Sequence, residues 1–280
     1  MKKTLHQRKI STWARRWLPQ GLRDALNRAI GYAIYFRGDY PDWAAAKADA
    51  SGYDEGSLLS RLKDAALAVK SGAAAWEQDG VVWEHIPLNM PILAMLSRVA
   101  LSDGGRLSVL DFGGGLGSSY FQCRDFLRPV AQVSWTVVEQ PNLAKIGRED
   151  IARDDLRFYD DLDLALKEQN PNVFIFSGVL QYLPNPWSIL SRATSTGAKF
   201  LIIDRHPCSI NNEKITVQVI PSHIYAASYP CWIFDCAAMK NKLLSNYELL
   251  AEWIGKDPPI RGHNKEAEYR GYFFQLRHES

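Results

Sequence analysis

One segment of the chain, Val109-Leu-Asp-Phe-Gly-Gly-Gly-Leu-Gly117, constrains the fold more than any other. It is an apolar run that reaches an acid, Asp111, and continues into glycines at the alternate positions Gly113, Gly115 and Gly117. Glycines allow a tight turn and let the backbone approach a ligand closely. The start of a following helix offers unpaired N–H groups to an anionic group. The segment therefore predicts a strand, a ligand-binding turn and a helix.

Beyond this segment, short β-branched runs alternate with helical patterns. Alternation of this kind is typical of a parallel sheet with helices on both faces. We therefore predict a doubly wound α/β fold with a mostly parallel, seven-stranded Rossmann-like sheet, in which one of the last two strands runs antiparallel. The predicted strands are 107–112, 133–139, 156–159, 173–176, 200–204, 247–254 and 269–277, and the predicted helices are 117–127, 142–153, 161–169, 186–195 and 235–245.

The residues before this domain follow another pattern, and we divide the chain into a helical N-terminal region, 1–104, and the α/β domain, 105–280. Residues 1–40 hold nine Lys or Arg and two Asp, which gives this segment a net charge of +7. Because the whole chain has a net charge of +2, residues 41–280 carry a net charge of −5. Two interpretations stay open for 1–40: a helix on a membrane surface or a helix that packs on the α/β domain. The helices predicted in this region are 18–34, 42–49, 57–76 and 87–101, with a turn-rich piece at 36–43.

The composition argues against several classes of protein. A net charge of +2 over 280 residues does not indicate nucleic-acid binding. No apolar run has the length of a transmembrane helix, and the basic N-terminus lacks the apolar stretch of a signal peptide. The four cysteines form no CxxC pair, so we expect neither a metal site nor a disulfide framework. We expect a cytoplasmic protein, peripheral to the inner membrane if residues 1–40 lie on lipid.

The spacing of the glycines separates two kinds of cofactor. A dinucleotide loop follows GxGxxG, whereas counting from Gly113 puts Ser118 at the third glycine position. An acid at the strand end followed by GxGxG favours S-adenosylmethionine, because Asp111 can hold an ammonium group that NAD lacks. Glu139 ends the next strand, 22 residues after Gly117, where an acid accepts hydrogen bonds from ribose hydroxyls.

Two further segments carry predicted site residues. After the third strand, Asp160 either contacts an adenine amino group or belongs to a helix N-cap together with Asp161, and both interpretations stay open. The fourth strand ends at the carboxyl edge of the sheet, where ligands bind in open α/β folds. There we expect Gln181 and Tyr182 to face the acceptor. The residues expected to line the cofactor at this strand end are Ser177, Gly178, Val179 and Leu180.

These motifs together resemble the class I S-adenosylmethionine-dependent methyltransferases over about residues 107–204. A narrower resemblance covers most of the chain, to a bacterial methyltransferase family of unestablished acceptor that is often associated with surface-polysaccharide gene clusters. The segments that carry the narrower resemblance are Phe36-Arg-Gly-Asp-Tyr40, Gly52-Tyr-Asp54, Val138-Glu-Gln-Pro141, Ile203-Asp-Arg205 and Ser228-Tyr-Pro-Cys-Trp232, whereas Val179-Leu-Gln-Tyr-Leu183 followed by Pro184 belongs to the class I resemblance.

The resemblance implies an S-adenosylmethionine-dependent methyltransferase. Asp111, the three alternate glycines, Glu139 and the 177–180 turn carry over as its cofactor residues. The implied reaction is O-methylation of a sugar or another small metabolite in cell-surface polysaccharide biosynthesis.

Segment 205–232 interrupts the regular alternation and is rich in aromatic residues. We predict that it forms a lid over the acceptor, with Tyr225 and Trp232 as walls beside a saccharide or other small molecule. A hydroxyl acceptor also needs a base. The candidates are His206 and His223, with Asp204 either catalytic or orienting one of them.

Two functions from other classes stay open. A nicotinamide-dependent oxidoreductase would share the glycine loop and the strand-end acid. A non-catalytic protein would bind S-adenosylmethionine or nothing, and would dock to a membrane or a partner enzyme through its basic segment.

Overall fold

The computed structural model describes residues 34–52, 55–210, 213–221, 226–257, 260 and 267–277. Apart from Ile34, the helix predicted at 18–34 lies outside these residues. Among the residues described, no helix is both long and apolar enough to cross a membrane.

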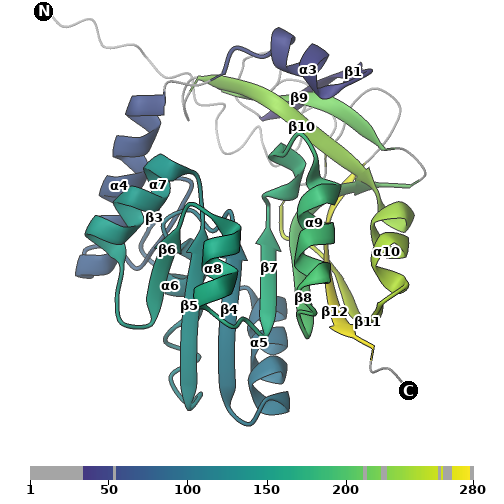
Figure 1. Cartoon of the computed structure of the whole chain (residues 1–280). Helices are drawn as coiled ribbons and strands as arrows, with labels where there is room; N and C mark the ends of the chain where they lie inside the picture. The colour runs from purple at the N-terminus through teal and green to yellow at the C-terminus, as the bar shows by residue number, and fades with distance from the viewer. Residues whose placement is uncertain are drawn as a thin grey trace, which may run out of the picture.

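A mostly parallel sheet of seven strands lies at the centre of the described part of the chain (Figure 1). Its strands are β4 Arg106–Phe112, β5 Gln132–Val138, β6 Leu156–Tyr159, β7 Val173–Ser177, β8 Phe200–Ser209, β11 Tyr247–Ile254 and β12 Glu268–Leu276. Their order is β6-β5-β4-β7-β8-β12-β11, and β12 alone runs antiparallel to its neighbours. The first strand of this sheet, β4, lies in its middle, and the later strands are added on one side and then on the other. This order confirms the predicted doubly wound fold.

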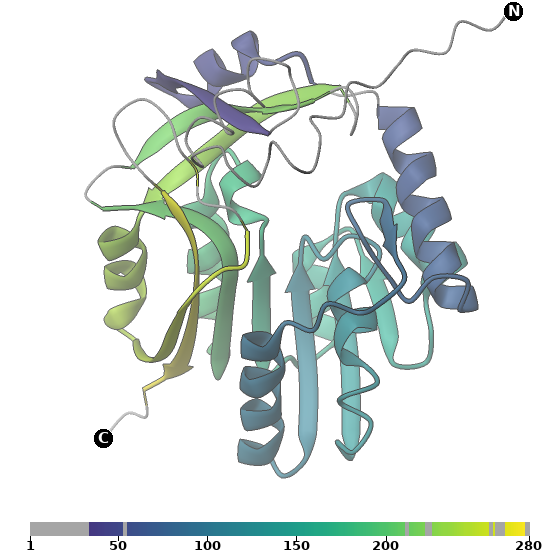
Figure 2. The same cartoon turned by 180° about the vertical axis from the view of Figure 1, so that it is seen from behind.

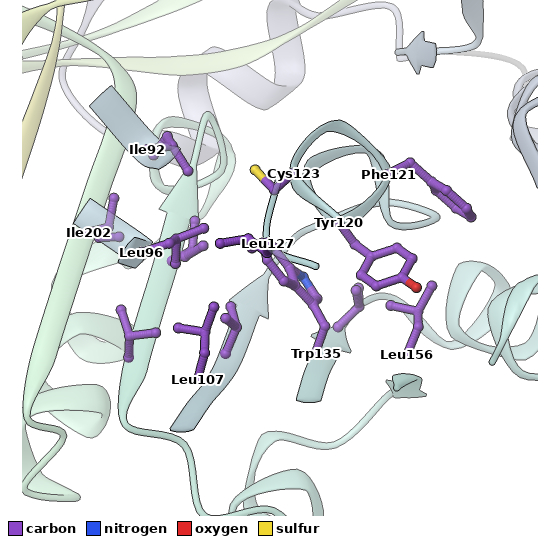
Figure 3. Close-up of a cluster of buried hydrophobic side chains, with 14 of the residues drawn as sticks. Ile92, Leu96, Leu107, Tyr120, Phe121, Cys123, Leu127, Trp135, Leu156 and Ile202 are labelled. Atoms are coloured by element: carbon purple, nitrogen blue, oxygen red, sulfur yellow. The ribbon is translucent and has the colours of Figure 1, made fainter. Parts of the chain in front are cut away.

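Helices cover both faces of this sheet. The helices are α4 Glu55–Ser71, α5 Met90–Ser102, α6 Ser118–Cys123, α7 Pro141–Ile146, α8 Leu162–Glu168, α9 Pro186–Ser195 and α10 Cys236–Leu244. Apolar residues of α4 to α7 form one core with the sheet, and those of α8 to α10 form the other. In the first core, shown in Figure 3, Leu96 of α5, Leu107 of β4 and Trp135 of β5 are fully buried.

Two helices begin where the sequence supplies both a cap and a proline. The Asn185 side chain accepts a hydrogen bond from the Ser188 amide at 3.2 Å, and Pro186 opens α9. The Asn89 side chain accepts one from the Ile92 amide in the same way at the start of α5. Such caps satisfy backbone donors that the first helical turn leaves unpaired, and α9 spans the residues predicted for it.

A small antiparallel layer lies across the end of the sheet toward which β7 points (Figures 1 and 2). It consists of β1 Tyr35–Tyr40, β9 Lys214–Ile220 and β10 Ala227–Asp235, with β9 in the middle. The short helix α3, Trp43–Asp49, packs on it through Ala46 and Trp43. The layer joins the main sheet where Phe234 of β10 pairs with Cys208 of β8. The region predicted as a lid therefore contains the end of β8, all of β9 and much of β10.

The N-terminal region differs from the helical prediction. The piece 36–43 was expected to be turn-rich, but most of it belongs to β1, since Tyr35 pairs with Val219 far along the chain. A pairing partner so distant in sequence leaves no local pattern. The helix predicted at 57–76 ends at Ser71, and Gly72 follows with a left-handed φ of 82°.

A hairpin of β2 Trp76–Gln78 and β3 Val81–Trp83 follows α4 and was not predicted. Its turn is Asp79-Gly80, with φ of 52° and 73°. An Asp-Gly pair between two short strands is a strong signal for such a turn, because both central residues need positive φ. The printed sequence therefore contained the information for this hairpin.

Leu96→Ala should destabilise the protein by about 2–5 kcal/mol, because Leu96 is fully buried in the first core and its loss leaves a cavity. The matched control is Leu101→Ala in the same helix, whose side chain is 84% exposed and should change stability by less than about 0.5 kcal/mol. Urea unfolding followed by circular dichroism measures both. Equal effects of the two substitutions would contradict the assignment of this core.

Candidate functional site

The predicted cofactor residues come together at the carboxyl ends of β4, β5 and β7. The strand register pairs Phe112 with Val138 and Val138 with Tyr159, so the loops after β4, β5 and β6 leave the sheet at one level. On the other side, Ser177 of β7 pairs with Asp204 of β8. Since β4 lies between β5 and β7, this is the switch point at which open α/β sheets bind ligands.

The glycine loop is closely packed on one side and open on the other. Gly113, Gly115 and Gly117 have φ of 72°, 60° and 92°, a region that residues with side chains rarely adopt. A Cβ on Gly113 would lie 2.2 Å from Cγ2 of Val179, so the loop after β4 touches the turn after β7. A Cβ on Gly115 would meet no atom within 4 Å. The loop therefore leaves room for a ligand at Gly115.

Asp111 lies beneath this loop and is only 1% exposed. Its Oδ2 accepts a hydrogen bond from Nε1 of Trp135 at 3.2 Å. Its Oδ1 is buried and forms no hydrogen bond among the described residues. Burial is the main cause that raises the pKa of Asp111 to about 7, while the Ser119 hydroxyl, close to the carboxyl, acts to lower its pKa. A buried acceptor without a partner is costly, and a cationic donor would satisfy it.

Glu139 connects the end of β5 to the glycine loop. Its Oε1 accepts a hydrogen bond from the Gly115 amide at 3.1 Å, and its Oε2 accepts one from the Gln140 amide at 2.7 Å. Desolvation raises the pKa of Glu139, although the two amides act in the opposite direction. The carboxylate thus lies at the open part of the loop, at the strand end where the sequence predicted it.

The two acids after β6 have separate roles. Asp161 caps α8, because its side chain accepts a hydrogen bond from the Leu164 amide at 2.8 Å. Asp160 is exposed and forms an ion pair with Arg148 at 3.4 Å. The N-cap interpretation is therefore confirmed for Asp161, and the adenine contact of Asp160 stays a prediction.

The turn after β7 places the predicted residues 177–180 opposite the glycine loop. Gly178 has a φ of 67°, and its amide donates to the carbonyl of Asp204 at 2.8 Å. The Leu180 amide donates to Nε2 of His206 at 3.1 Å. These two bonds hold the turn against β8.

His206 therefore differs from the prediction that it is a catalytic base. It is fully buried, and its Nε2 lone pair is occupied by the Leu180 amide. Burial lowers its pKa to about 3. A general base needs a lone pair that reaches the proton of the substrate, so we correct the role of His206 to support of the turn after β7.

Asp204 is also a structural anchor in place of the predicted catalytic or histidine-orienting group. It is 1% exposed, and its Oδ1 accepts from Nε1 of Trp253 at 2.8 Å while its Oδ2 accepts from Nδ2 of Asn89 at 2.9 Å. The carboxylate thus ties β11 and the start of α5 to β8. The other predicted base, His223, and the predicted wall residue Tyr225 lie outside the described residues.

The predicted acceptor residues Tyr182 and Trp232 lie in different surroundings. The Tyr182 hydroxyl hydrogen-bonds to Oε1 of Gln218 at 2.9 Å, and its ring is edge-on to that of Tyr229, with centroids 5.3 Å apart. Gln218 and Tyr229 pair across β9 and β10. The antiparallel layer therefore brings two residues to Tyr182 that the sequence analysis did not single out.

Trp232 is a packing residue and does not stand as a free wall. Its ring stacks on those of Trp43 and Phe234, both with centroids 6.2 Å away. Its Nε1 donates to the carbonyl of Leu183 at 2.9 Å. These contacts join the antiparallel layer to the turn after β7, which explains an aromatic residue at this position without a ligand.

The β2–β3 hairpin contributes residues that the sequence analysis missed. Nε1 of Trp76 donates to the carbonyl of Ser118 at 2.9 Å, and the Ser118 hydroxyl donates to the carboxylate of Glu77. Glu77 is only 3% exposed, and desolvation raises its pKa. Since Ser118 directly follows the last glycine of the loop, the hairpin adjoins the predicted cofactor site.

No protein-family model matches the chain, and no curated protein sequence matches it. Among solved structures, the chain is similar to the N-terminal domain of EvdMO1 in the presence of SAH and D-fucose, at 15% identity and a TM-score of 0.46, over 81% of this chain and 98% of that chain. It is also similar to magnesium protoporphyrin IX methyltransferase (ChlM) from Synechocystis PCC 6803 with bound SAM, at 13% identity and a TM-score of 0.43, over 67% and 79% of the two chains. A third is the CcbJ methyltransferase from Streptomyces caelestis, at 12% identity and a TM-score of 0.42, over 67% and 96%. Since these TM-scores lie below 0.5, the fold assignment rests on the order and register of the chain's own strands.

Gly113→Ala should destabilise the protein by several kcal/mol, because the new Cβ combines a positive φ with a collision against Val179. Gly197→Ala is the matched control, since Gly197 has the same φ of 72° but no atom within 4 Å of an added Cβ. Gly197→Ala should lower the free energy of unfolding by only about 1 kcal/mol, the cost of a side chain at positive φ. Thermal unfolding of both variants measures the difference, and equal losses would refute the close contact between the two loops.

Asp111→Asn should change how stability depends on pH. Because the folded-state pKa is raised from 3.8 to about 7, the wild type holds its proton more tightly when folded and loses stability as pH rises from about 4 to 7. The variant lacks this loss, so its stability relative to the wild type should rise by up to about 4 kcal/mol between pH 4 and pH 8. Urea unfolding at both pH values checks this. Asp125→Asn, at an exposed position, is the control for replacing an Asp by Asn elsewhere on the chain.

Proposed function

We propose that the chain binds S-adenosylmethionine at the carboxyl edge of β4, β5 and β7 and transfers its methyl group to a small-molecule acceptor. The observation that carries the proposal is the unpartnered, buried Oδ1 of Asp111 beneath the glycine loop. It is an acceptor suited to an ammonium group, which S-adenosylmethionine has and a dinucleotide lacks. Glu139, which follows the neighbouring strand β5, suits the ribose hydroxyls of either kind of cofactor, so Asp111 is the residue that separates the two.

The residues at this edge fit such a cofactor. The space at Gly115 admits a ligand next to the backbone, and Glu139 can exchange its bond to the Gly115 amide for bonds to ribose hydroxyls. Asp111 supplies the acceptor for the ammonium group. The turn at Gly178 faces the loop through the contact of Val179 with Gly113.

A bound sulfonium cofactor supplies an activated methyl group with a good leaving group, so the protein chiefly has to align the reactants. Alignment of this kind contributes roughly 7–11 kcal/mol to lowering a barrier. A rigid edge serves this purpose. The bonds from Gly178 to Asp204 and from Leu180 to His206 hold the turn after β7 in one position.

We extend the proposal to O-methylation of a hydroxylated small molecule such as a sugar. Its support is the group formed by Tyr182, Gln218 and Tyr229, because phenol and amide side chains both donate to and accept from hydroxyl groups. His223 remains a candidate for the base that takes the hydroxyl proton. The role in surface-polysaccharide biosynthesis, the cytoplasmic location and the membrane contact of residues 1–40 remain predictions from the sequence.

Calorimetric titration of the purified chain tests this proposal. S-adenosylmethionine should bind saturably, whereas NAD and ATP should not. Glu139→Ala should weaken the binding at least tenfold, because the ribose hydroxyls lose a charged acceptor worth about 1.5–3 kcal/mol. Glu149→Ala, which removes an exposed acid from the turn after α7, is the control and should bind normally.

Preferential binding of NAD would favour the oxidoreductase alternative, and binding of none of the three ligands would refute the proposal. If Glu139→Ala binds S-adenosylmethionine as tightly as the wild type, the cofactor assignment stands but Glu139 is not part of the binding site.

A further inference from the structure

Arg205 has an unusual backbone conformation at the carboxyl end of β8. Its φ is 58°, and among the described residues other than glycine only Asp79 shares a positive φ. Such a conformation costs about 1–3 kcal/mol and persists where the surrounding contacts impose it. A Cβ built on Gly178 would lie 3.8 Å from both Cβ and Nη1 of Arg205. The side chain therefore lies against the turn after β7, at the edge where the cofactor is proposed to bind.

The guanidinium of Arg205 joins two other segments. Its Nε and Nη2 donate to the two carboxylate oxygens of Asp257 at 3.1 and 3.3 Å. With the Gln78 amide turned so that Oε1 faces the guanidinium, Oε1 accepts from Nη1 at 2.8 Å. Asp257 follows β11, and Gln78 belongs to the β2–β3 hairpin. The planar guanidinium can pair with both oxygens of Asp257 and still donate to Gln78, whereas a lysine lacks this planar bidentate geometry.

The opposite side of the hairpin is attached to the glycine loop. Trp76 and Glu77 both bond to Ser118, the first residue of α6. Glu77 also accepts from the Gly80 amide at 3.2 Å, which fixes its carboxylate inside the hairpin. Since β7 lies between β4 and β8, the hairpin is attached on both sides of the carboxyl end of β7.

The chain after the hairpin is attached to the same edge. In Figure 2 this connection crosses the sheet in front of β4 before it enters α5. The Leu88 carbonyl accepts from Nζ of Lys256 at 2.8 Å, and the Asn89 side chain donates to Asp204. Asp204 and Arg205 thus hold the segment from 78 to 89 at two consecutive positions of β8.

We infer that Arg205 is a positioning residue that holds the β2–β3 hairpin over the amino-acid end of bound S-adenosylmethionine. The inference rests on the proposed function. That end of the ligand carries the ammonium group for which Asp111 has a free acceptor, and Asp111 lies on β4, the strand whose glycine loop leads to Ser118, one of the two attachments of the hairpin. The adenosine end is expected at Glu139, on the far side of β4 from Arg205. Loosening the hairpin should therefore affect one end of the ligand and spare the other.

Two ligands separate these ends: S-adenosylhomocysteine, which has the amino-acid group, and 5′-methylthioadenosine, which lacks it. In Arg205→Lys, we expect the affinity for S-adenosylhomocysteine to fall about tenfold through faster dissociation, with the affinity for 5′-methylthioadenosine changed less than twofold. Arg106→Lys is the matched control, because Arg106 also bonds to two partners, Asp103 and the Asn170 carbonyl, but at the amino end of β4. It should leave both affinities unchanged.

A second variant, Gln78→Leu, removes the Gln78 amide from the guanidinium of Arg205 and keeps the ion pair of Arg205 with Asp257. This variant should lower the affinity for S-adenosylhomocysteine severalfold and leave the affinity for 5′-methylthioadenosine unchanged. That result would support the inference even if Arg205→Lys folds poorly. Equal losses for the two ligands, or no loss in either variant, would overturn the inference and leave the proposed function standing. If the wild type binds neither ligand, the proposed function fails and the inference fails with it.

Discussion

The contact between the glycine loop and the turn after β7 determines the geometry of the whole candidate site. Gly113 admits Val179 at a distance that any side chain would prevent, and this brings the ends of β4 and β7 together. Beneath the contact, Asp111 is excluded from water and keeps one oxygen unpaired. The same close packing therefore builds the wall of the site and leaves a buried carboxylate oxygen without a hydrogen bond. This unpaired acceptor is the physical basis on which we propose that the site binds a cationic ligand group.

Around this contact, buried polar groups act as supports and not as reagents. His206 holds Leu180 through Nε2, and both carboxylate oxygens of Asp204 hold neighbouring segments through Trp253 and Asn89. Buried polar groups need partners, and once they have them they specify one arrangement of the chain. The sequence alone therefore does not distinguish a catalytic histidine or aspartate at a strand end from one that holds neighbouring segments in place.

Much of the α/β domain could be predicted because its signals are local. The strand 156–159, the helix 186–195 and the strand 247–254 have the bounds that their patterns predict, since each combines apolar periodicity with nearby turn or cap residues. The antiparallel layer could not be predicted as such, because β1 pairs with β9, which lies far along the chain with most of the main sheet between them in sequence. The hairpin at Asp79-Gly80 is a different case, since its turn signal was present and local.

By itself, the sequence determined the doubly wound sheet, the glycine loop at its switch point and the acids at the ends of β4 and β5, because periodicity and glycine spacing act over a few residues. Only the tertiary structure decided which polar side chains stay accessible. It buried His206 and Asp204 in supporting contacts, packed the half-buried Trp232 against other aromatic rings, and brought Gln78 and Asp257 to Arg205 from distant segments. The reason is that burial and hydrogen-bond partners depend on how remote segments pack, and no local pattern encodes that packing.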